Sequence, residues 1–205
     1  HPLMCDFVFN NPITFHGRLA VWFHQSGLFS PLLPSPLFEY SDALMLTSKC
    51  SLAANNILRL DKNIKEKISV ISSACELENL PKTRPVRDNC VGLMRAAYAG
   101  TLNFSKLHPQ FGEWVGASKE ALCHLDIYGD RINQEIILSN LYKSEANFVT
   151  KFHGFIDNLY ENLTNSNVFI YLLNPLHYGT AENALVEAMA AGLLPVVLDN
   201  PAERA

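Results

Sequence analysis

Short, almost continuously apolar runs alternate with helix-like segments along most of this 205-residue chain. Strands that are apolar on both faces are typical of parallel sheets buried between helices. A strand with one solvent-exposed face alternates apolar and polar residues instead. A repeat of strand, helix and strand predicts parallel strands joined by helical crossovers. The sequence therefore predicts an α/β fold of Rossmann-like parallel sheets.

The alternation places the expected elements along the chain. Strands are expected at 18–24, 43–47, 67–72, 94–100, 124–130, 147–155, 167–175 and 194–200. Helices are expected at 51–60, 108–122, 132–143, 157–166 and 179–192. The stretch between 74 and 92 is polar, contains two prolines and shows no helical or strand periodicity of apolar residues, which is typical of a linker. We expect a first domain at 1–80, a linker at 81–92 and a second domain at 93–205.

Composition narrows the classes of protein. Hydrophobic residues make up 48% and charged residues 18% of the chain, which suits a packed core rather than disorder. The net charge of -4 argues against a nucleic-acid-binding protein. No apolar run approaches the roughly 20 residues that span a bilayer, so at most peripheral membrane association is expected.

Five cysteines are scattered without a CxxC pair, which argues against a zinc site. Their odd number in a chain of this size favours reduced thiols and a cytoplasmic location. No pair of acidic residues stands in a metal-binding context either. We therefore expect no required metal or cofactor.

In a parallel sheet, ligands bind beyond the carboxyl ends of the strands. Gly100 ends an expected strand there, and Lys106 follows six residues later. The Lys106 amine could reach a diphosphate from this position, although a solvated surface lysine fits the same stretch. The chain contains neither GxxxxGK[ST] nor GxGxxG, which argues against a P-loop enzyme and a nicotinamide enzyme.

The segment "HYGTAENALVEAMAAGLLPVVLDNP" combines a loop, an alanine-rich helix and a strand. Thr180 is a good residue to cap the helix, which would leave backbone N–H groups free to bind phosphate. Glu187 lies two turns further on the same face and could accept hydrogen bonds from two ribose hydroxyls. The alternative is that Glu182 and Glu187 are solvated residues of one helix edge. For Glu182 both interpretations remain open.

The same segment resembles the donor-binding signature of the retaining glycosyltransferases of GT-B architecture that are grouped as family four. The resemblance is carried by Glu187 to Gly192, "EAMAAG", and by Pro195-Val196. In the same order, "AYAGTLNFSKLH", "HLDIYGD" and "FHGFIDNLYENLTNSNVFIYLLNP" are similar to other donor-domain segments of that family. "LAVWFHQSG" is similar to an acceptor-domain strand that ends in a histidine.

The resemblance implies a GT-B-like fold in which part of an acceptor domain precedes most of a nucleotide-sugar-binding domain. It also implies roles for single residues. Lys106 would bind the diphosphate, Glu187 the ribose, and backbone groups of Phe155 and Ile156 the base. His24 would lie beside the transferred sugar as a catalytic residue together with Lys106. The implied donor-binding set comprises Gly100, Thr101, Lys106, Phe155, Ile156, Gly179, Thr180, Ala181, Glu182 and Glu187.

The implied activity is that of a hexosyltransferase acting with retention in polysaccharide or glycoconjugate synthesis. The donor would be a UDP-, GDP- or ADP-sugar, and the acceptor a hydroxyl group of a carbohydrate or of a lipid-linked acceptor. The resemblance begins deep in the acceptor domain and stops after one strand beyond the signature, so we expect a fragment truncated at both ends.

Two positions depart from the family pattern. Thr101 stands where the family has an arginine, and Gly179 stands where it has its first acid. One of two cations for the diphosphate is then missing, which leaves more of the charge to Lys106, to the helix N-terminus at Thr180 and to His108. Two alternatives therefore stay open: a nucleotide-sugar epimerase of the same architecture, and a non-catalytic nucleotide-binding or scaffold module.

Overall fold

The computed structural model describes residues 17–73, 92–180 and 182–204. These residues form two compact units. The first unit holds 17–73, 178–180 and Arg204, and the second holds 92–177 and 182–203. The expected linker at 81–92 lies outside the described residues except for Gly92.

The first unit is built on a parallel three-stranded sheet in the order β1-β2-β3. Its strands are β1 (Ala20–Phe23), β2 (Ala43–Leu46) and β3 (Ile68–Val70). The short helices α2 (Pro36–Tyr40), α3 (Asn55–Leu58) and α4 (Lys62–Lys65) accompany the sheet, together with the 3₁₀ helix η1 (Lys49–Ala53). Its core contains Phe23, Leu33, Phe38, Leu44, Leu46 and Ile57.

The helix expected at 51–60 is interrupted. Ala54 has an extended backbone between η1 and α3. The Asn56 side chain accepts a hydrogen bond from the Ile57 amide and donates one to the Leu33 carbonyl at 2.7 Å. Asparagine side chains compete in this way with helical backbone bonds, which accounts for the break.

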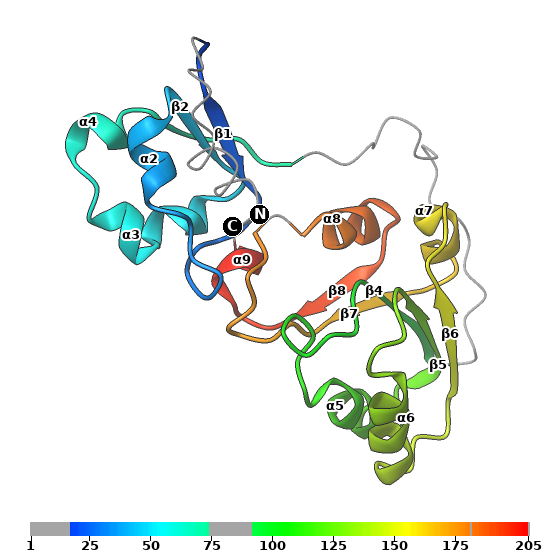
Figure 1. Ribbon diagram of the computed structural model, residues 1–205. Helices are drawn as coiled ribbons and strands as arrows, with labels where there is room; N and C mark the ends of the chain where they lie inside the picture. The colour runs from blue at the N-terminus through cyan, green and yellow to red at the C-terminus, as the bar shows by residue number, and fades with distance from the viewer. Residues whose placement is uncertain (1–16, 74–91, 181, 205) are drawn as a thin grey trace. The chain divides into compact units, whose positions relative to one another are not determined.

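The second unit contains a parallel five-stranded sheet in the order β6-β5-β4-β7-β8. The strands are β4 (Met94–Ala99), β5 (Leu122–Tyr128), β6 (Val149–Gly154), β7 (Val168–Tyr171) and β8 (Leu194–Val197). The helices α5 (Phe111–Ala117) and α6 (Gln134–Lys143) lie on one face, and α7 (Leu159–Leu163) and α8 (Asn183–Ala190) on the other (Figure 1). The short helix α9 (Pro201–Arg204) follows β8. All expected strands are present, so the predicted α/β fold with parallel sheets is confirmed.

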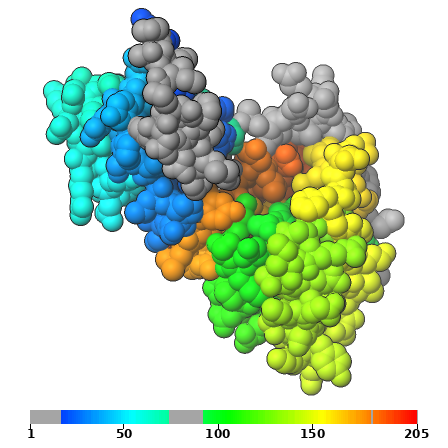
Figure 2. Space-filling view, in the orientation of Figure 1, coloured from blue at the N-terminus to red at the C-terminus, as the bar shows by residue number. Residues whose placement is uncertain are grey.

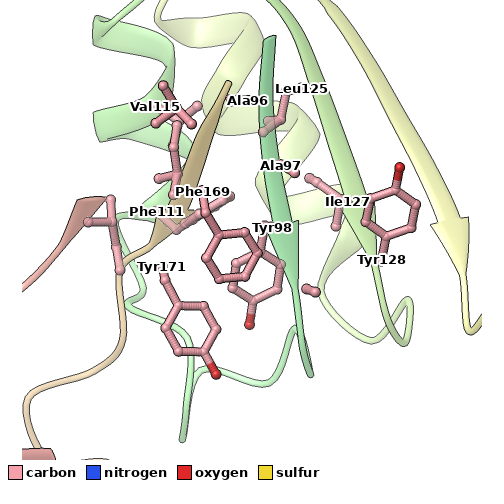
Figure 3. Close-up of a cluster of buried hydrophobic side chains, with 14 of the residues drawn as sticks. Ala96, Ala97, Tyr98, Phe111, Val115, Leu125, Ile127, Tyr128, Phe169 and Tyr171 are labelled. Atoms are coloured by element: carbon pink, nitrogen blue, oxygen red, sulfur yellow. The ribbon is translucent and has the colours of Figure 1, made fainter. Parts of the chain in front are cut away.

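Aromatic rings fill the centre of the second unit beside β4 and β7. Tyr98 and Tyr171 are fully buried, with ring centroids 5.7 Å apart, and Phe169 stacks on Tyr171 at 5.3 Å (Figure 3). Phe111 of α5 meets the Tyr98 ring edge-on from the helical layer. All four residues of β7 are buried, as a near-continuous apolar run predicts for a strand covered on both faces.

Two glycines bring α5 close to α6. A Cβ atom on Gly112 would lie 2.9 Å from the Ile137 carbonyl oxygen, and one on Gly116 would lie 2.5 Å from the Ser144 Cβ. The missing side chains therefore allow the two helices to pack closely as one layer. Figure 2 shows that layer as a continuous surface, coloured green to yellow-green.

Helix α8 begins at Asn183, with Glu182 as its N-terminal cap residue. The expectation of a helix from 179 capped by Thr180 is therefore wrong. Residues 178–180 are held in the first unit instead: the Ser26 amide donates to the Tyr178 carbonyl at 2.9 Å, and the Thr47 hydroxyl donates to the Thr180 hydroxyl at 2.7 Å. These contacts between distant parts of the chain keep the segment out of the helix.

Cys50 is a free thiol, whereas Cys123 takes part in a disulfide. The expectation that the thiols are reduced is therefore wrong for Cys123. Within the described part of the chain, no helix combines the length and the apolar character needed to cross a membrane.

Candidate functional site

Three neighbouring strands of the second unit each end in a glycine with positive φ, and we call Gly100, Gly129 and Gly154 the glycine rim. Their φ angles are 149°, 146° and 76°. The Gly100 amide donates to the Tyr128 carbonyl at 2.9 Å, and the Gly129 amide donates to the Gly154 carbonyl at the same distance. Gly129 is buried, and Gly100 and Gly154 are partly buried, so the rim places closely packed backbone without side chains at the edge where parallel sheets bind ligands.

Asp130 follows Gly129 of the rim, and its carboxylate accepts hydrogen bonds from the loop after β4. The Thr101 hydroxyl donates to its carboxylate, as do the backbone amides of Leu102 at 3.1 Å and Ile132 at 3.0 Å. Burial alone would raise the pKa of Asp130, but these hydrogen bonds outweigh it and lower the pKa. Thr101 is thus engaged in an internal hydrogen bond where a member of the resembled family would present an arginine.

Lys106 emerges from the same loop and forms an ion pair. Its Nζ lies 2.9 Å from Oε2 of Glu182, the residue before α8. The Glu182 side chain is 6% exposed and that of Lys106 is 20% exposed. The sequence left the role of Glu182 open, and the structure shows it to be a buried partner of Lys106 rather than a solvated residue.

Glu182 is held by further polar residues around it. The Tyr171 hydroxyl donates to Glu182 Oε2 at 2.6 Å, and His177 Nδ1 lies 3.9 Å from Oε1. On its other side, His177 Nε2 lies 3.3 Å from Glu203 Oε1. Burial raises the pKa of Tyr171 well above its usual value, and the charge of Glu182 adds to the effect. Tyr171 and His177 were not predicted as site residues, although "HYGTAEN" contains His177.

Glu187 lies in the second turn of α8 and is half-buried. Burial raises the pKa of its carboxyl group. Within the described residues, no side chain or amide donates a hydrogen bond to this carboxylate. A partly desolvated carboxylate with this much free acceptor capacity can bind hydroxyl groups of a ligand.

Phe155 and Ile156 follow the rim after Gly154. The Phe155 side chain is 84% exposed, whereas Ile156 packs partly against the core. The backbone at these two positions therefore lies at the carboxyl edge of the sheet, where their expected contact with a base would occur.

The remaining predicted residues belong to the first unit. His24 is exposed and its ring lies 4.6 Å from that of Trp22. Thr180 is buried, and its hydroxyl lies 3.5 Å from the His24 carbonyl. Gly179 belongs to the same segment, and Ala181 lies outside the described residues. The structure thus brings Gly100, Thr101, Lys106, Glu182 and Glu187 into the second unit, and His24, Gly179 and Thr180 into the first.

His108 does not replace the missing arginine. Its ring stacks on Trp114 at 4.1 Å, and its Nδ1 accepts a hydrogen bond from the Gln110 amide at 3.1 Å. Burial lowers the pKa of His108, so its ring is neutral at pH 7. Lys106 is therefore left as the cation of this loop.

A second polar cluster, centred on the buried Asp126 of β5, was not predicted. Its Oδ1 lies 2.6 Å from His153 Nε2 and 3.2 Å from His124 Nε2, and its Oδ2 lies 3.6 Å from Arg95. The alternation of His124 and Asp126 in "HLDIYGD" places both on one face of the strand. Among the residues that the structure describes, no group of three or more His, Cys, Asp or Glu is arranged to hold a metal ion.

The His124 ring makes the stability of the protein depend on pH. Burial lowers the pKa of His124 below 6.5, with Asp126 acting against the shift and Arg95 with it. The unfolded chain therefore binds a proton that the folded chain does not, so we expect His124 to lower the free energy of unfolding as the pH drops below about 6.5. Urea unfolding between pH 7 and pH 5 measures this slope, and His124→Gln should flatten it.

Two other groups change the free energy of unfolding in the opposite direction or in a different pH range. The raised pKa of Glu187 adds stability as the pH falls towards 4.5, which opposes the effect of His124. The lowered pKa of Asp130 costs stability only below about 3.8. Identical slopes in the wild type and His124→Gln would show that His124 has no part in the acid response.

No protein-family model matches the chain, and no curated protein matches its sequence. Solved structures resemble it in fold. They include TarM from S. aureus, in complex with fondaparinux, alpha-GlcNAc-glycerol and UDP, at 14% identity and a TM-score of 0.69 over 96% of this chain. HepE from Anabaena, in complex with UDP and glucose, has 11% identity and a TM-score of 0.69 over 99% of this chain.

A glycosyltransferase from Rickettsia africae is also similar, with 14% identity and a TM-score of 0.62 over 92% of this chain. The present chain spans 40%, 57% and 53% of these three proteins, respectively. At such low identity the likeness shows the fold alone. The GT-B-like architecture expected from the sequence is therefore confirmed.

Proposed function

We propose that the chain is the nucleotide-sugar-binding part of a glycosyltransferase, which moves a hexose from a nucleoside-diphosphate sugar to an acceptor hydroxyl with retention, as in the family that the sequence resembles. One observation carries the proposal: Lys106, whose side chain is partly exposed, lies in the loop that follows Gly100 of the glycine rim, at the carboxyl edge of a GT-B-like sheet. Two of the proteins similar in fold hold UDP, so a UDP-sugar is the first donor to test, ahead of GDP- and ADP-sugars.

In this reaction the bond between the sugar carbon and the diphosphate oxygen breaks, a bond to the acceptor oxygen forms, and the proton of the acceptor hydroxyl passes to the leaving diphosphate. Negative charge grows on the leaving diphosphate as the sugar becomes oxocarbenium-like. Lys106 would stabilise that charge from a fixed position, because its backbone carbonyl accepts from the Asn174 amide at 2.7 Å and its amide donates to Asn103. Backbone groups of Phe155 and Ile156 would hold the base.

Glu187 would bind the two ribose hydroxyls. His24, an exposed histidine after β1, would stand on the acceptor side, where a carbohydrate or lipid-linked hydroxyl is positioned and water is excluded. Cytoplasmic synthesis of a polysaccharide or glycoconjugate is the setting that we propose, with at most peripheral membrane association and no required metal.

One set of contacts favours a second candidate, a module that binds nucleotides without transferring sugar. Thr101 and Lys106 are both engaged with internal carboxylates, those of Asp130 and Glu182. A site with less free positive charge stabilises a leaving diphosphate less well. Binding would survive this loss more readily than catalysis.

Incubation with radiolabelled UDP-, GDP- and ADP-sugars distinguishes these functions. Label that moves to an added carbohydrate acceptor supports the glycosyltransferase, whereas label retained on the protein without turnover supports the binding module. Conversion of a labelled donor to the epimeric nucleotide sugar, or release of the epimeric sugar, would support the epimerase. A protein that neither binds nor consumes any of the donors would contradict the proposed function.

Glu187→Gln tests the ribose contact. A neutral amide accepts weaker hydrogen bonds from two hydroxyls than a carboxylate does, so the affinity for a nucleoside diphosphate should fall roughly tenfold. Inorganic pyrophosphate has no ribose, and its affinity should barely change. Calorimetry with both ligands measures the difference, and equal losses for the two would contradict the ribose role of Glu187.

A further inference from the structure

The positive charge of Lys106 is already balanced inside the protein. Its amine lies 2.9 Å from Glu182 Oε2, and the two formal charges cancel. An ammonium group has three N–H donors, and the remaining ones can still face a ligand because the side chain is 20% exposed. A phosphate bound there would meet an ion pair rather than an isolated cation.

Glu182 is held in place and cannot readily withdraw when a ligand arrives. The same Oε2 atom accepts from the Tyr171 hydroxyl at 2.6 Å, and Tyr171 is fully buried. Moving the carboxylate away would leave a buried hydroxyl without its acceptor, which is costly. The internal negative charge therefore stays beside Lys106 in the bound state.

This balance has different consequences for ligands of different charge. A nucleoside diphosphate ends in a phosphate that carries a second negative charge near pH 7, whereas a sugar nucleotide has a sugar in that place. Beside an isolated lysine, the extra charge would strengthen binding. Beside the neutral pair of Lys106 and Glu182, the extra negative charge adds little to the free energy of binding.

We propose that Glu182 is a specificity-determining residue that weakens the binding of the free nucleoside diphosphate relative to the sugar nucleotide, and so favours release of the product. This inference rests on the proposed function, since it takes Lys106 as the diphosphate ligand. It assigns Glu182 a role through the charge of Lys106, without contact between Glu182 and the sugar.

The test compares UDP and UDP-glucose by calorimetry in the wild type and in E182Q. The glutamine oxygen can still accept from Lys106 and Tyr171, so the substitution removes the charge and keeps the contacts. The affinity for UDP should rise relative to that for UDP-glucose by roughly three- to tenfold. E145Q is the matched control: it removes the same charge from an exposed residue paired with Lys119, and the ratio should not change.

A further variant tests the contact that holds Glu182 in place. Tyr171→Phe keeps the charge of Glu182 but removes the hydroxyl that binds it, so the ratio of the two affinities should lie between those of the wild type and E182Q. In the wild type itself, the neutral pair predicts a similar salt dependence for UDP and UDP-glucose, a measurement that needs no variant. A steeper salt dependence for UDP would contradict the inference.

The possible failures differ from one another. If both ligands bind the wild type and their ratio is the same in E182Q, the role of Glu182 is refuted while the proposed function stands. A parallel change in both affinities would refute it equally. If neither UDP nor UDP-glucose binds the wild type, the proposed donor site itself is wrong and the inference falls with it.

Discussion

Replacing Gly129 with alanine is expected to lower the free energy of unfolding of the second unit by about 2–5 kcal/mol, the sum of backbone strain and steric overlap. The new Cβ would lie 1.9 Å from the Gly100 carbonyl oxygen, and Gly129 has a φ of 146°. The clash cannot be relieved by a side-chain rotation, because the atom in the way belongs to the backbone. Urea unfolding measures the loss.

Gly154→Ala is the matched control at the same rim. Its φ of 76° also disfavours alanine, but no atom lies within 4 Å of the added Cβ. Only the strain remains, which amounts to about 1–2 kcal/mol. An equal loss of stability in the two variants would mean that the close approach of Gly100 and Gly129 has no energetic importance.

Replacing Lys106 with methionine is expected to weaken the binding of a nucleoside diphosphate roughly 10- to 100-fold, the effect of losing charged hydrogen bonds to phosphate. Methionine preserves much of the apolar stem, so packing beside Tyr171 changes little. The variant leaves Glu182 buried without its cation, and a lower melting temperature should accompany the loss of affinity. Calorimetry and thermal unfolding measure the two effects.

Lys119→Met removes the same charge from a different ion pair, that with Glu145. It should leave nucleotide affinity within error of the wild type. If Lys106→Met retained full affinity while folded, Lys106 would have no place in the donor site.

The central strands β4, β5 and β7 could be predicted from the sequence because burial on both faces leaves a local signal. Val168–Tyr171 is apolar at every position, and no polar side chain disturbs the pattern. The short helices α2, α4 and α9 were not predicted, since elements of four or five residues carry too few residues to show a helical period.

The start of α8 depends on contacts that no local pattern contains. Thr180 has the chemistry of a cap residue, but its hydroxyl bonds to Thr47, 133 positions earlier in the chain. Local preference was outweighed by this long-range contact. The role of a cap residue therefore fell to Glu182.

The candidate site could be predicted in part. Gly100, Lys106 and Glu187 follow from their positions after strands and on a helix. The pairing of Lys106 with Glu182 could not be seen, because the two residues come from loops after different strands and only folding brings them together. The cluster around Asp126 was missed for the same reason: Arg95, Asp126 and His153 lie on three separate strands.

A crystal structure of the protein soaked with a mixture of UDP, GDP and ADP would show whether the proposed donor site exists. We expect one nucleoside diphosphate at the glycine rim, with a phosphate oxygen within hydrogen-bond distance of Lys106 Nζ and the ribose hydroxyls at the Glu187 carboxylate. A nucleotide bound elsewhere, with Lys106 still contacting only Glu182, would contradict it.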